Sequence, residues 1–260
     1  MSVRSLHPSG PILAPMLTSL LRRLFGPAPA AENPLLAYAL AHPEGRVMNK
    51  WDHYFDLYHR HFARWRGRAF TMIEIGVFNG GSLRMWREYF GPQARIVGVD
   101  ANPDCAAFAE PGIAIEIGDQ GDREFLRALA GRYPPPAIVL DDGGHHMHQQ
   151  VATFEELYPG MHPEGVYACE DTHTSYLPHF GGGAGKPGTF IEMAKTLVDR
   201  LHTLDAASAQ ADAFALATDS IHFYDRMVVL ERRPRALPMD AIYGREARLR
   251  YVAPSVSGKL

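Results

Sequence analysis

The chain has 260 residues, of which 46% are hydrophobic, and this favours one globular domain with short appendages. Its formal net charge of -3, without blocks of like charge, excludes a broad electrostatic grip on nucleic acid. Its two cysteines, Cys105 and Cys169, cannot form a disulfide framework, so we expect a reducing, cytoplasmic setting.

The N-terminal part predicts an arm with helices over residues 1–47. Residues 1–34 are rich in proline and alanine, and residues 16–25 form an amphipathic pattern with leucines on one side. We expect that helix to pack on its own domain or on a second subunit, with membrane contact as the alternative. No apolar run reaches the roughly 18–20 residues that cross a bilayer, so we expect no membrane-spanning segment.

From residue 70 onward, short buried strands alternate with helices. The pattern predicts strands at 70–75, 95–100, 113–117, 137–141 and 165–170. It predicts helices at 35–66, where aromatic residues recur, and at 82–89, 122–133, 148–158 and 190–203. The aromatic side chains between 51 and 65 indicate core packing, with a wall of an acceptor pocket as the alternative. Alternation at this spacing implies crossover units and a parallel sheet, so we predict a doubly wound α/β fold.

The last two strands differ from the others. Apolar runs at 220–224 and 227–231 are joined by Asp225-Arg226, which predicts a hairpin. The sheet would then have seven strands, mostly parallel, and would finish in an antiparallel hairpin. We predict a main domain over residues 48–235 and a tail over 236–260.

Ligands bind open parallel sheets beyond the carboxyl ends of the strands. The first strand contains Glu74 and leads into Gly76, Gly80 and Ser82 at the start of a helix, where backbone can approach an anionic ligand. The spacing is not the dinucleotide pattern GxGxxG. Asp100 ends the second strand, where an acid can accept the ribose hydroxyls of a nucleoside.

Polar residues also follow the third, fourth and fifth strands. Asp119 and Gln120 follow the third and can read an adenine edge, or cap the next helix. The other two strand ends bring four carboxylates to one rim: Asp141, Asp142, Glu170 and Asp171. Such crowding is costly unless a cation intervenes, and Mg²⁺ favours oxygen ligands, although caps and arginine pairs could also satisfy them.

A histidine beside such a cation could act as a general base. His145 lies three positions after Asp142. The sequence alone does not rank it above four rivals, which are His146, His148, His173 and His179.

Taken together, these motifs resemble the macrolide-sugar O-methyltransferases of the mycinamicin and macrocin type, over about residues 48–232. They are the segments 74–86, 118–120, 141–145 and 170–176. One departure is Gly144, which stands where the family usually has serine.

The resemblance implies a Rossmann-like methyltransferase fold, S-adenosylmethionine as methyl donor, Mg²⁺ and a homo-oligomer. It implies Asp142, Glu170 and Asp171 as metal ligands and His145 as the catalytic base. It implies that the following residues bind the cofactor or support its pocket: Glu74, Gly76, Gly80, Ser82, Asp100, Asp119, Gln120 and Asp141.

We therefore predict a metal-dependent O-methyltransferase acting on a hydroxyl of a small molecule, such as a sugar or other diol of a natural product. Neither nucleic acid nor membrane is expected as a partner. Three alternatives stay open. One is an oxygenase-like relative of the cephalosporin hydroxylase type, which would depend on ferrous iron and oxygen. Another is a nicotinamide-dependent dehydrogenase, disfavoured by the missing GxGxxG and the final hairpin. The third is a non-catalytic S-adenosylmethionine-binding protein.

Overall fold

A seven-stranded sheet forms the centre of the protein in the computed structural model, which describes residues 33–203 and 212–236. The strands are β1 (Thr71–Ile75), β2 (Arg95–Asp100), β3 (Ile113–Ile117), β4 (Ile138–Asp141), β5 (Val166–Cys169), β6 (Thr218–Tyr224) and β7 (Met227–Arg232). Their order is β3-β2-β1-β4-β5-β7-β6, and β1 to β5 run parallel. The predicted doubly wound fold is confirmed.

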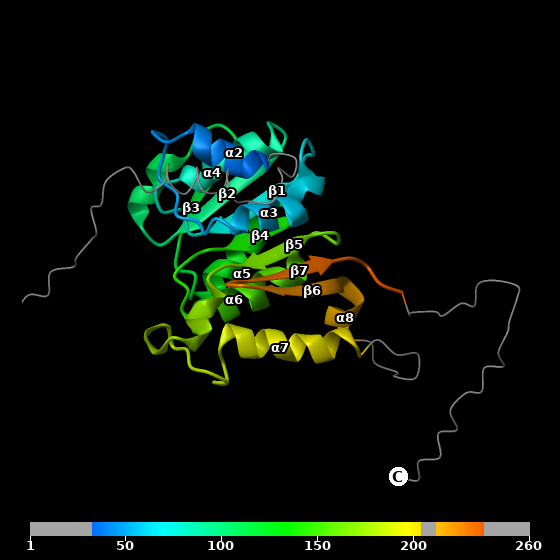
Figure 1. The fold of residues 1–260 in the computed structure, drawn as a ribbon. Helices are drawn as coiled ribbons and strands as arrows, with labels where there is room; N and C mark the ends of the chain where they lie inside the picture. The colour runs from blue at the N-terminus through cyan, green and yellow to red at the C-terminus, as the bar shows by residue number, and fades with distance from the viewer. Residues whose placement is uncertain (1–32, 204–211, 237–260) are drawn as a thin grey trace, which may run out of the picture.

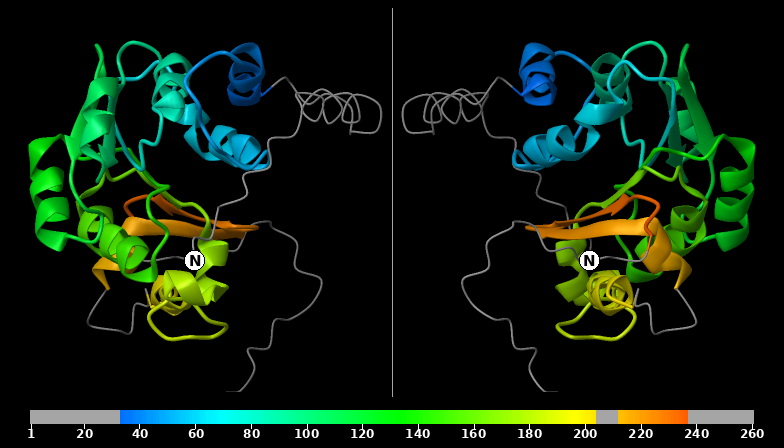
Figure 2. Two further views of the ribbon diagram at one scale, coloured as in Figure 1. Left: turned by 90° about the vertical axis from the view of Figure 1, so that its left-hand side faces the viewer. Right: turned by 90° about the vertical axis from the view of Figure 1, so that its right-hand side faces the viewer.

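The hairpin at the end of the chain is also confirmed. Strand β7 pairs antiparallel with both β5 and β6, and the two-residue turn Asp225-Arg226 joins the two hairpin strands. Figure 2 shows the orange hairpin with α3 on one side and the yellow α7 on the other.

Helices cover both faces of the sheet (Figure 1). On one face lie α2 (Pro34–Ala41), α3 (Tyr54–Phe62) and α4 (Gly81–Phe90). On the other lie α5 (Arg123–Arg132), α6 (Met147–Leu157) and α7 (Phe190–Leu201), and the short α8 (Ala213–Ala217) precedes β6. Five short 3-10 helices complete the described elements: η1 (Ala63–Trp65), η2 (Pro103–Phe108), η3 (Tyr158–Gly160), η4 (Thr172–Tyr176) and η5 (Pro178–Phe180).

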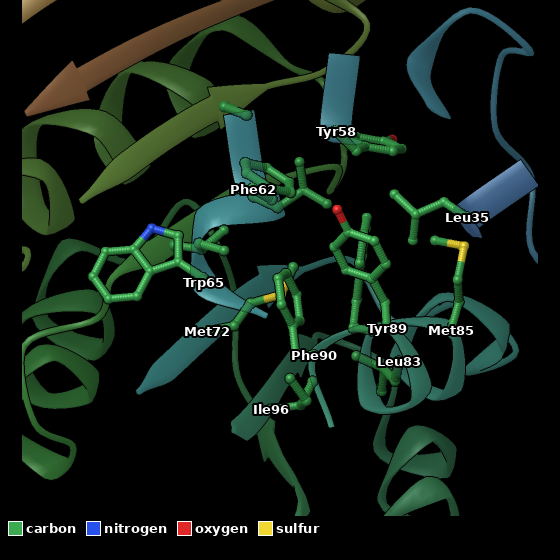
Figure 3. Close-up of a cluster of buried hydrophobic side chains, with 14 of the residues drawn as sticks. Leu35, Tyr58, Phe62, Trp65, Met72, Leu83, Met85, Tyr89, Phe90 and Ile96 are labelled. Atoms are coloured by element: carbon green, nitrogen blue, oxygen red, sulfur yellow. The ribbon is translucent and has the colours of Figure 1, made fainter. Parts of the chain in front are cut away.

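The two cores follow from the alternation of side chains along each strand. Successive residues of a strand point to opposite faces, so Met72 joins one core while Ile73 joins the other. Figure 3 shows the first core, in which Tyr58 and Phe62 of α3 pack near Phe90 of α4 and Met72 of β1. Both faces of β1, β4 and β5 are therefore buried, which is why their sequences are mostly apolar, whereas the edge strand β3 is only partly buried.

One prediction about the helices is partly wrong. Residues 35–66 were expected to be helical throughout, but α2 ends at Ala41 and α3 begins only at Tyr54. Pro43 and Gly45 follow α2 directly, and both residue types disfavour helix continuation. The predicted aromatic core is confirmed for α3, because Tyr54, Phe55 and Tyr58 are buried.

Several predictions concern segments that the structure does not describe. The amphipathic helix at 16–25 and the tail beyond 236 lie outside the described residues. The domain limits at 47 and 235 stay predictions, although α2 already packs the fully buried Leu35 into the core. Within the described residues, no helix is long and apolar enough to cross a membrane.

Candidate active site

A cavity of about 430 Å³ lies at the carboxyl ends of the central strands. Eight of the predicted site residues line it: Gly76, Ser82, Asp100, Asp119, Gln120, Asp142, His145 and Asp171. The crossover topology explains the gathering, because parallel strands end at the same edge of a sheet and their following loops meet there.

The glycine turn after β1 forms one wall of the cavity. Gly76 has a φ of 94°, and a Cβ there would lie 2.0 Å from the carbonyl oxygen of Asp142, so only glycine fits. Gly80, with a φ of 70°, closes the turn by donating its N–H to Val77 at 2.8 Å. Asp100 braces the same turn, because its Oδ2 accepts the N–H groups of Val77 at 2.9 Å and Phe78 at 3.2 Å.

The polar residues after β3 connect to the end of β4. Gln120 is buried, and its amide nitrogen donates to Asp141 Oδ1 at 2.5 Å while its oxygen accepts from the Gly144 N–H at 3.0 Å. Burial raises the pKa of Asp141 to about 6. Asp119 lines the cavity, and its Oδ1 accepts the N–H of Gly121 at 2.7 Å. Gln120 therefore fixes the loop after β4 relative to β3.

Asp142, His145 and Asp171 form a cluster at the edge of this cavity, here called the rim cluster. Their potential ligand atoms all lie within 4.8 Å of one another. His145 Nε2 lies 3.5 Å from Asp171 Oδ2 and 3.9 Å from Asp142 Oδ1. The buried Nδ1 of His145 has no hydrogen-bond partner among the described residues.

The backbone is strained at two members of the rim cluster. His145 has a φ of 57° and Asp171 a φ of 51°, in the left-handed region that side chains other than glycine rarely adopt. Such strain gathers at sites where the surrounding structure fixes a side chain in one place. Here it brings side chains from the ends of β4 and β5 to face each other.

The predicted ligand Glu170 lies in a neighbouring group of buried charges. Its Oε1 accepts hydrogen bonds from Tyr58 and, at 3.0 Å, from the ammonium of Lys50. The same ammonium lies 2.6 Å from Asp142 Oδ2 and 3.4 Å from Glu74 Oε1. Glu74 does not line the cavity; its Oε2 accepts the Ser82 hydroxyl at 2.9 Å.

Burial and charge act against each other in this buried group. Burial and the negative charge of Asp142 raise the pKa of Glu170 well above its usual value, against the lowering effect of Lys50. Burial likewise raises the pKa of Glu74. For Lys50 burial works to lower the pKa, but the charges of Asp142, Glu170 and Glu74 together raise it well above the usual value. The ammonium therefore keeps its charge and neutralises part of the acid cluster, a name used here for the carboxylates of Glu74, Asp142, Glu170 and Asp171.

The chain is similar to sugar O-methyltransferases. It is 37% identical over 234 residues to 8-demethyl-8-alpha-L-rhamnosyl tetracenomycin-C 2'-O-methyltransferase of Streptomyces olivaceus, which covers 84% of this chain and 60% of that protein. It is 40% identical over 154 residues to mycinamicin VI 2''-O-methyltransferase of Micromonospora griseorubida, over 55% of this chain and 38% of that protein. No family model matches the chain.

A solved structure shows the same likeness. MycE methyltransferase from the mycinamycin biosynthetic pathway, in complex with Mg and SAH, matches with a TM-score of 0.68 and 30% identity over 86% of this chain and 60% of that one. The described residues therefore have the Rossmann-like methyltransferase fold, and the chain is similar to the macrolide-sugar O-methyltransferases. It spans about 60% or less of the length of these curated relatives.

The five candidate histidines differ in how close they lie to the rim cluster. His145 belongs to the rim cluster, and His173 Nδ1 lies 3.9 Å from Asp171 Oδ1. His146 is the N-cap of α6, and its backbone N–H donates to the side-chain oxygen of Gln149 at 3.3 Å. His148 and His179 are exposed. The geometry thus favours His145 over its rivals, with His173 next.

Sequence reasoning missed four residues that hold the acid cluster: Lys50, Trp51, Tyr54 and Tyr58. Trp51 Nε1 and the Tyr54 hydroxyl each donate to Asp171 Oδ1 at 3.0 Å. The aromatic spacing predicts core, which is correct for the rings of Tyr54 and Tyr58 and wrong for Trp51, whose side chain is exposed, and it overlooks the hydroxyl and indole N–H groups. The available clue is a lysine four residues before an aromatic helix that carries hydroxyl groups.

Proposed function

We propose that the protein is an S-adenosylmethionine-dependent, Mg²⁺-dependent O-methyltransferase that methylates a sugar hydroxyl of a glycosylated natural product. The observation that carries this proposal is the rim cluster of Asp142, His145 and Asp171 beside a cavity with a glycine wall. In support, the two relatives are named for methyl transfer to 8-demethyl-8-alpha-L-rhamnosyl tetracenomycin-C and to mycinamicin VI.

The residues fit both groups that the proposal requires. The cavity has the glycine turn at one wall and carboxylate and amide groups of Asp100, Asp119 and Gln120 at the others, which suits a nucleoside. The rim cluster offers the carboxylates of Asp142 and Asp171, oxygen donors that suit a hard divalent cation, with the imidazole of His145 beside them. Glu170 would join that set as predicted only if its carboxylate turned from Lys50.

In the proposed mechanism, this chain positions the acceptor and moves one proton. Mg²⁺, when bound, supplies Lewis acidity that lowers the pKa of a coordinated sugar hydroxyl. Asp142 and Asp171 would hold the cation, and His145 Nε2 would take the proton of the reacting hydroxyl. The glycine turn and Asp100 would orient the donor so that its methyl group faces the acceptor oxygen in line.

Changing Asp142 to Ala tests this function. We expect methyl transfer from S-adenosylmethionine to a rhamnosylated polyketide to be abolished, while equilibrium binding of the methyl donor stays close to that of the wild type. Product is measured by mass spectrometry and donor binding by calorimetry. Normal turnover by the variant, or by wild-type protein stripped with chelator, would contradict the metal's role.

The oxygenase alternative is tested with the same protein. Formation of a hydroxylated product with ferrous iron and oxygen, without methyl transfer, would replace the proposed function. A protein that binds S-adenosylmethionine but transfers no methyl group to any glycosylated acceptor would favour a non-catalytic role.

We also propose a cytoplasmic homo-oligomer. Cys105 and Cys169 are both buried free thiols, as expected in a reducing compartment. Strand β6 lies at the edge of the sheet and carries Phe223, whose side chain is exposed, so a second copy has an apolar surface to cover. Light scattering on the full chain measures the assembly state, and a monomer at micromolar concentration would contradict it.

A further inference from the structure

Lys50 is the buried cation of the acid cluster. Its side chain is 2% exposed, and its ammonium reaches carboxylates at the ends of three strands, Glu74, Asp142 and Glu170. The ammonium also lies 5.8 Å from the ring centre of Tyr58. One positive charge thus serves three carboxylates, two of which are almost completely buried.

The contacts of Lys50 overlap with those expected of a divalent cation. Asp142 and Glu170 are two of the three predicted metal ligands, and Lys50 binds one oxygen of each, Oδ2 at 2.6 Å and Oε1 at 3.0 Å. A divalent cation held by the same carboxylates would lie close to the ammonium and would be repelled by it. Asp142 Oδ1, which faces His145, is the oxygen of that carboxylate turned toward the rim cluster.

We propose that Lys50 is an internal counter-cation that competes with the divalent cation for Asp142 and Glu170, and thereby lowers the affinity of the site for metal. The inference rests on the metal dependence of the proposed function. Lys50 stabilises the buried carboxylates before the cation binds, and its ammonium leaves Glu170 when this carboxylate joins the metal ligands. Lys50 is therefore a positioning residue, and it takes no part in proton transfer.

The competition predicts that removing the Lys50 ammonium strengthens the binding of Mg²⁺. Lys50→Met removes the ammonium and keeps a side chain of similar length. We expect the variant to bind Mg²⁺ about tenfold more tightly or better, because the repulsion is gone. In chelator we expect a lower Tm than the wild type, since the buried carboxylates lose their neutralising charge, and we expect Mg²⁺ to restore most of that loss.

Two control variants separate charge from packing. Lys195→Met removes an exposed lysine that pairs with Glu192 at 2.6 Å on the surface of α7, and it should change neither Mg²⁺ affinity nor the response of Tm to Mg²⁺. Lys50→Arg keeps the charge, so its Mg²⁺ affinity should be no tighter than that of the wild type. Affinity is measured by calorimetric titration of Mg²⁺ alone into the full chain, and Tm by scanning calorimetry with chelator and with Mg²⁺.

Each outcome either supports or overturns the inference. Lys50→Met that binds Mg²⁺ no more tightly than the wild type, with a Tm that Mg²⁺ does not restore, overturns it. If Lys50→Met folds only when Mg²⁺ is present, the competition is supported. If it folds under neither condition, Lys50→Gln is measured in the same way, and the same absence of a Mg²⁺ effect overturns the inference.

The same titrations distinguish this inference from the proposed function. Binding of Mg²⁺ by Lys50→Met but not by the wild type would leave the competition standing and refute the metal dependence of the wild-type enzyme. A wild type that binds Mg²⁺ and transfers methyl groups, with Lys50→Met binding no more tightly, would refute the competition alone. Binding by neither would refute both.

Discussion

Among the described residues, two clusters combine histidine with carboxylate, and they differ in how many of their polar atoms already have hydrogen-bond partners. The rim cluster contains Asp142, His145 and Asp171; the hairpin cluster contains His61, His222 and Glu231, between α3 and the strands β6 and β7. In each, the potential ligand atoms lie within 4.8 Å of one another. Residue type and spacing alone would therefore assign both to a metal.

The hairpin cluster is already satisfied by protein groups. Glu231 binds His61 Nδ1 at 2.6 Å through one oxygen and Arg64 at 2.9 Å through the other. His61 Nε2 lies 2.9 Å from the Tyr224 hydroxyl, and His222 Nε2 lies 2.9 Å from the Ser220 hydroxyl. A cation would have to displace these partners and would be repelled by Arg64, so the cluster stabilises the contact between α3 and the hairpin.

The rim cluster has weaker internal contacts and faces a cavity. Its histidine lies 3.5 Å or more from either carboxylate, beyond a good hydrogen bond, and the buried Nδ1 of His145 has no partner in the part of the chain that the structure describes. Its backbone is strained at two positions where the hairpin cluster has regular helix and strand. Unmet bonding capacity beside a cavity, rather than the kind of residue, distinguishes a binding site from a structural ion pair.

The largest expected difference concerns the two histidines. His145→Gln should lower kcat by about 1,000-fold, because a general base is removed, while binding of the methyl donor is kept. His61→Gln should lower the free energy of unfolding but leave kcat per folded molecule unchanged. Steady-state methyl transfer and urea unfolding measure the two effects. Equal loss of kcat in both variants would remove the distinction between the clusters.

Removing a carboxylate should weaken Mg²⁺ binding when the carboxylate belongs to the rim cluster and should have no effect when it belongs to the hairpin cluster. Asp171→Asn should raise the Kd for Mg²⁺ by about 100-fold, since even partners outside the direct ligands commonly change metal affinity by 10- to 100-fold. Glu231→Gln should leave that Kd unchanged. Titration of Mg²⁺ into both variants gives the comparison. A Kd that responds to Glu231 and not to Asp171 would move the metal to the hairpin cluster.

The fold could be predicted from the sequence because its causes are local. Apolar strands alternate with helices, and Asp225-Arg226 joins two apolar runs, so the sheet and hairpin followed directly. The meeting of Asp142 with Asp171 also followed, because β4 and β5 are neighbours with parallel register.

Lys50 could not be placed in the same way. It is 92 residues from Asp142 and 120 from Glu170, so only the tertiary fold brings them together. For the same reason the sequence could not show that the hairpin cluster exists, since His61 and Glu231 are 170 residues apart. Polar contacts between residues far apart in the sequence leave no repeated pattern, so sequence analysis could not predict them.

Acid titration tests how much the ionised Glu231 of the hairpin cluster contributes to stability. The hydrogen bond from His61 and the ion pair with Arg64 lower the pKa of Glu231 to about 2. Because the unfolded value is about 4.3, this carboxylate stabilises the folded state above pH ~4.3, and the contribution is lost as the pH falls toward 2. At pH 7, Glu231→Gln should cost about 2 kcal/mol, allowing for partial exposure.

Urea unfolding at several pH values measures this contribution. The difference in free energy of unfolding between wild type and Glu231→Gln should narrow steadily between pH ~4.3 and pH ~2. The matched variant Glu164→Gln changes another carboxylate, which is exposed, and should follow the wild type. A difference that stays constant with pH would show that the ion pair contributes nothing through ionisation.

The smallest expected effect tests whether the two clusters are independent, since α3 braces both. Tyr54 accepts the Asp171 N–H at 3.1 Å, and its hydroxyl lies within donating distance of the Arg226 carbonyl at 2.9 Å. Burial raises the pKa of Tyr54, so the hydroxyl keeps its proton. Tyr54→Phe should cost about 1 kcal/mol of stability, the loss of a hydrogen bond at a strained backbone position.

A double variant with His61→Gln completes the test, because His61 lies two turns further along the same helix. If the clusters are independent, the two losses should add within about 0.5 kcal/mol, measured as free energies of unfolding in urea with an unchanged m-value. A larger coupling would mean that α3 transmits changes from the hairpin cluster to Asp171. The hairpin cluster would then help to position Asp171 in the candidate active site. The two clusters would differ in how far they lie from the cavity, and both would contribute to the site.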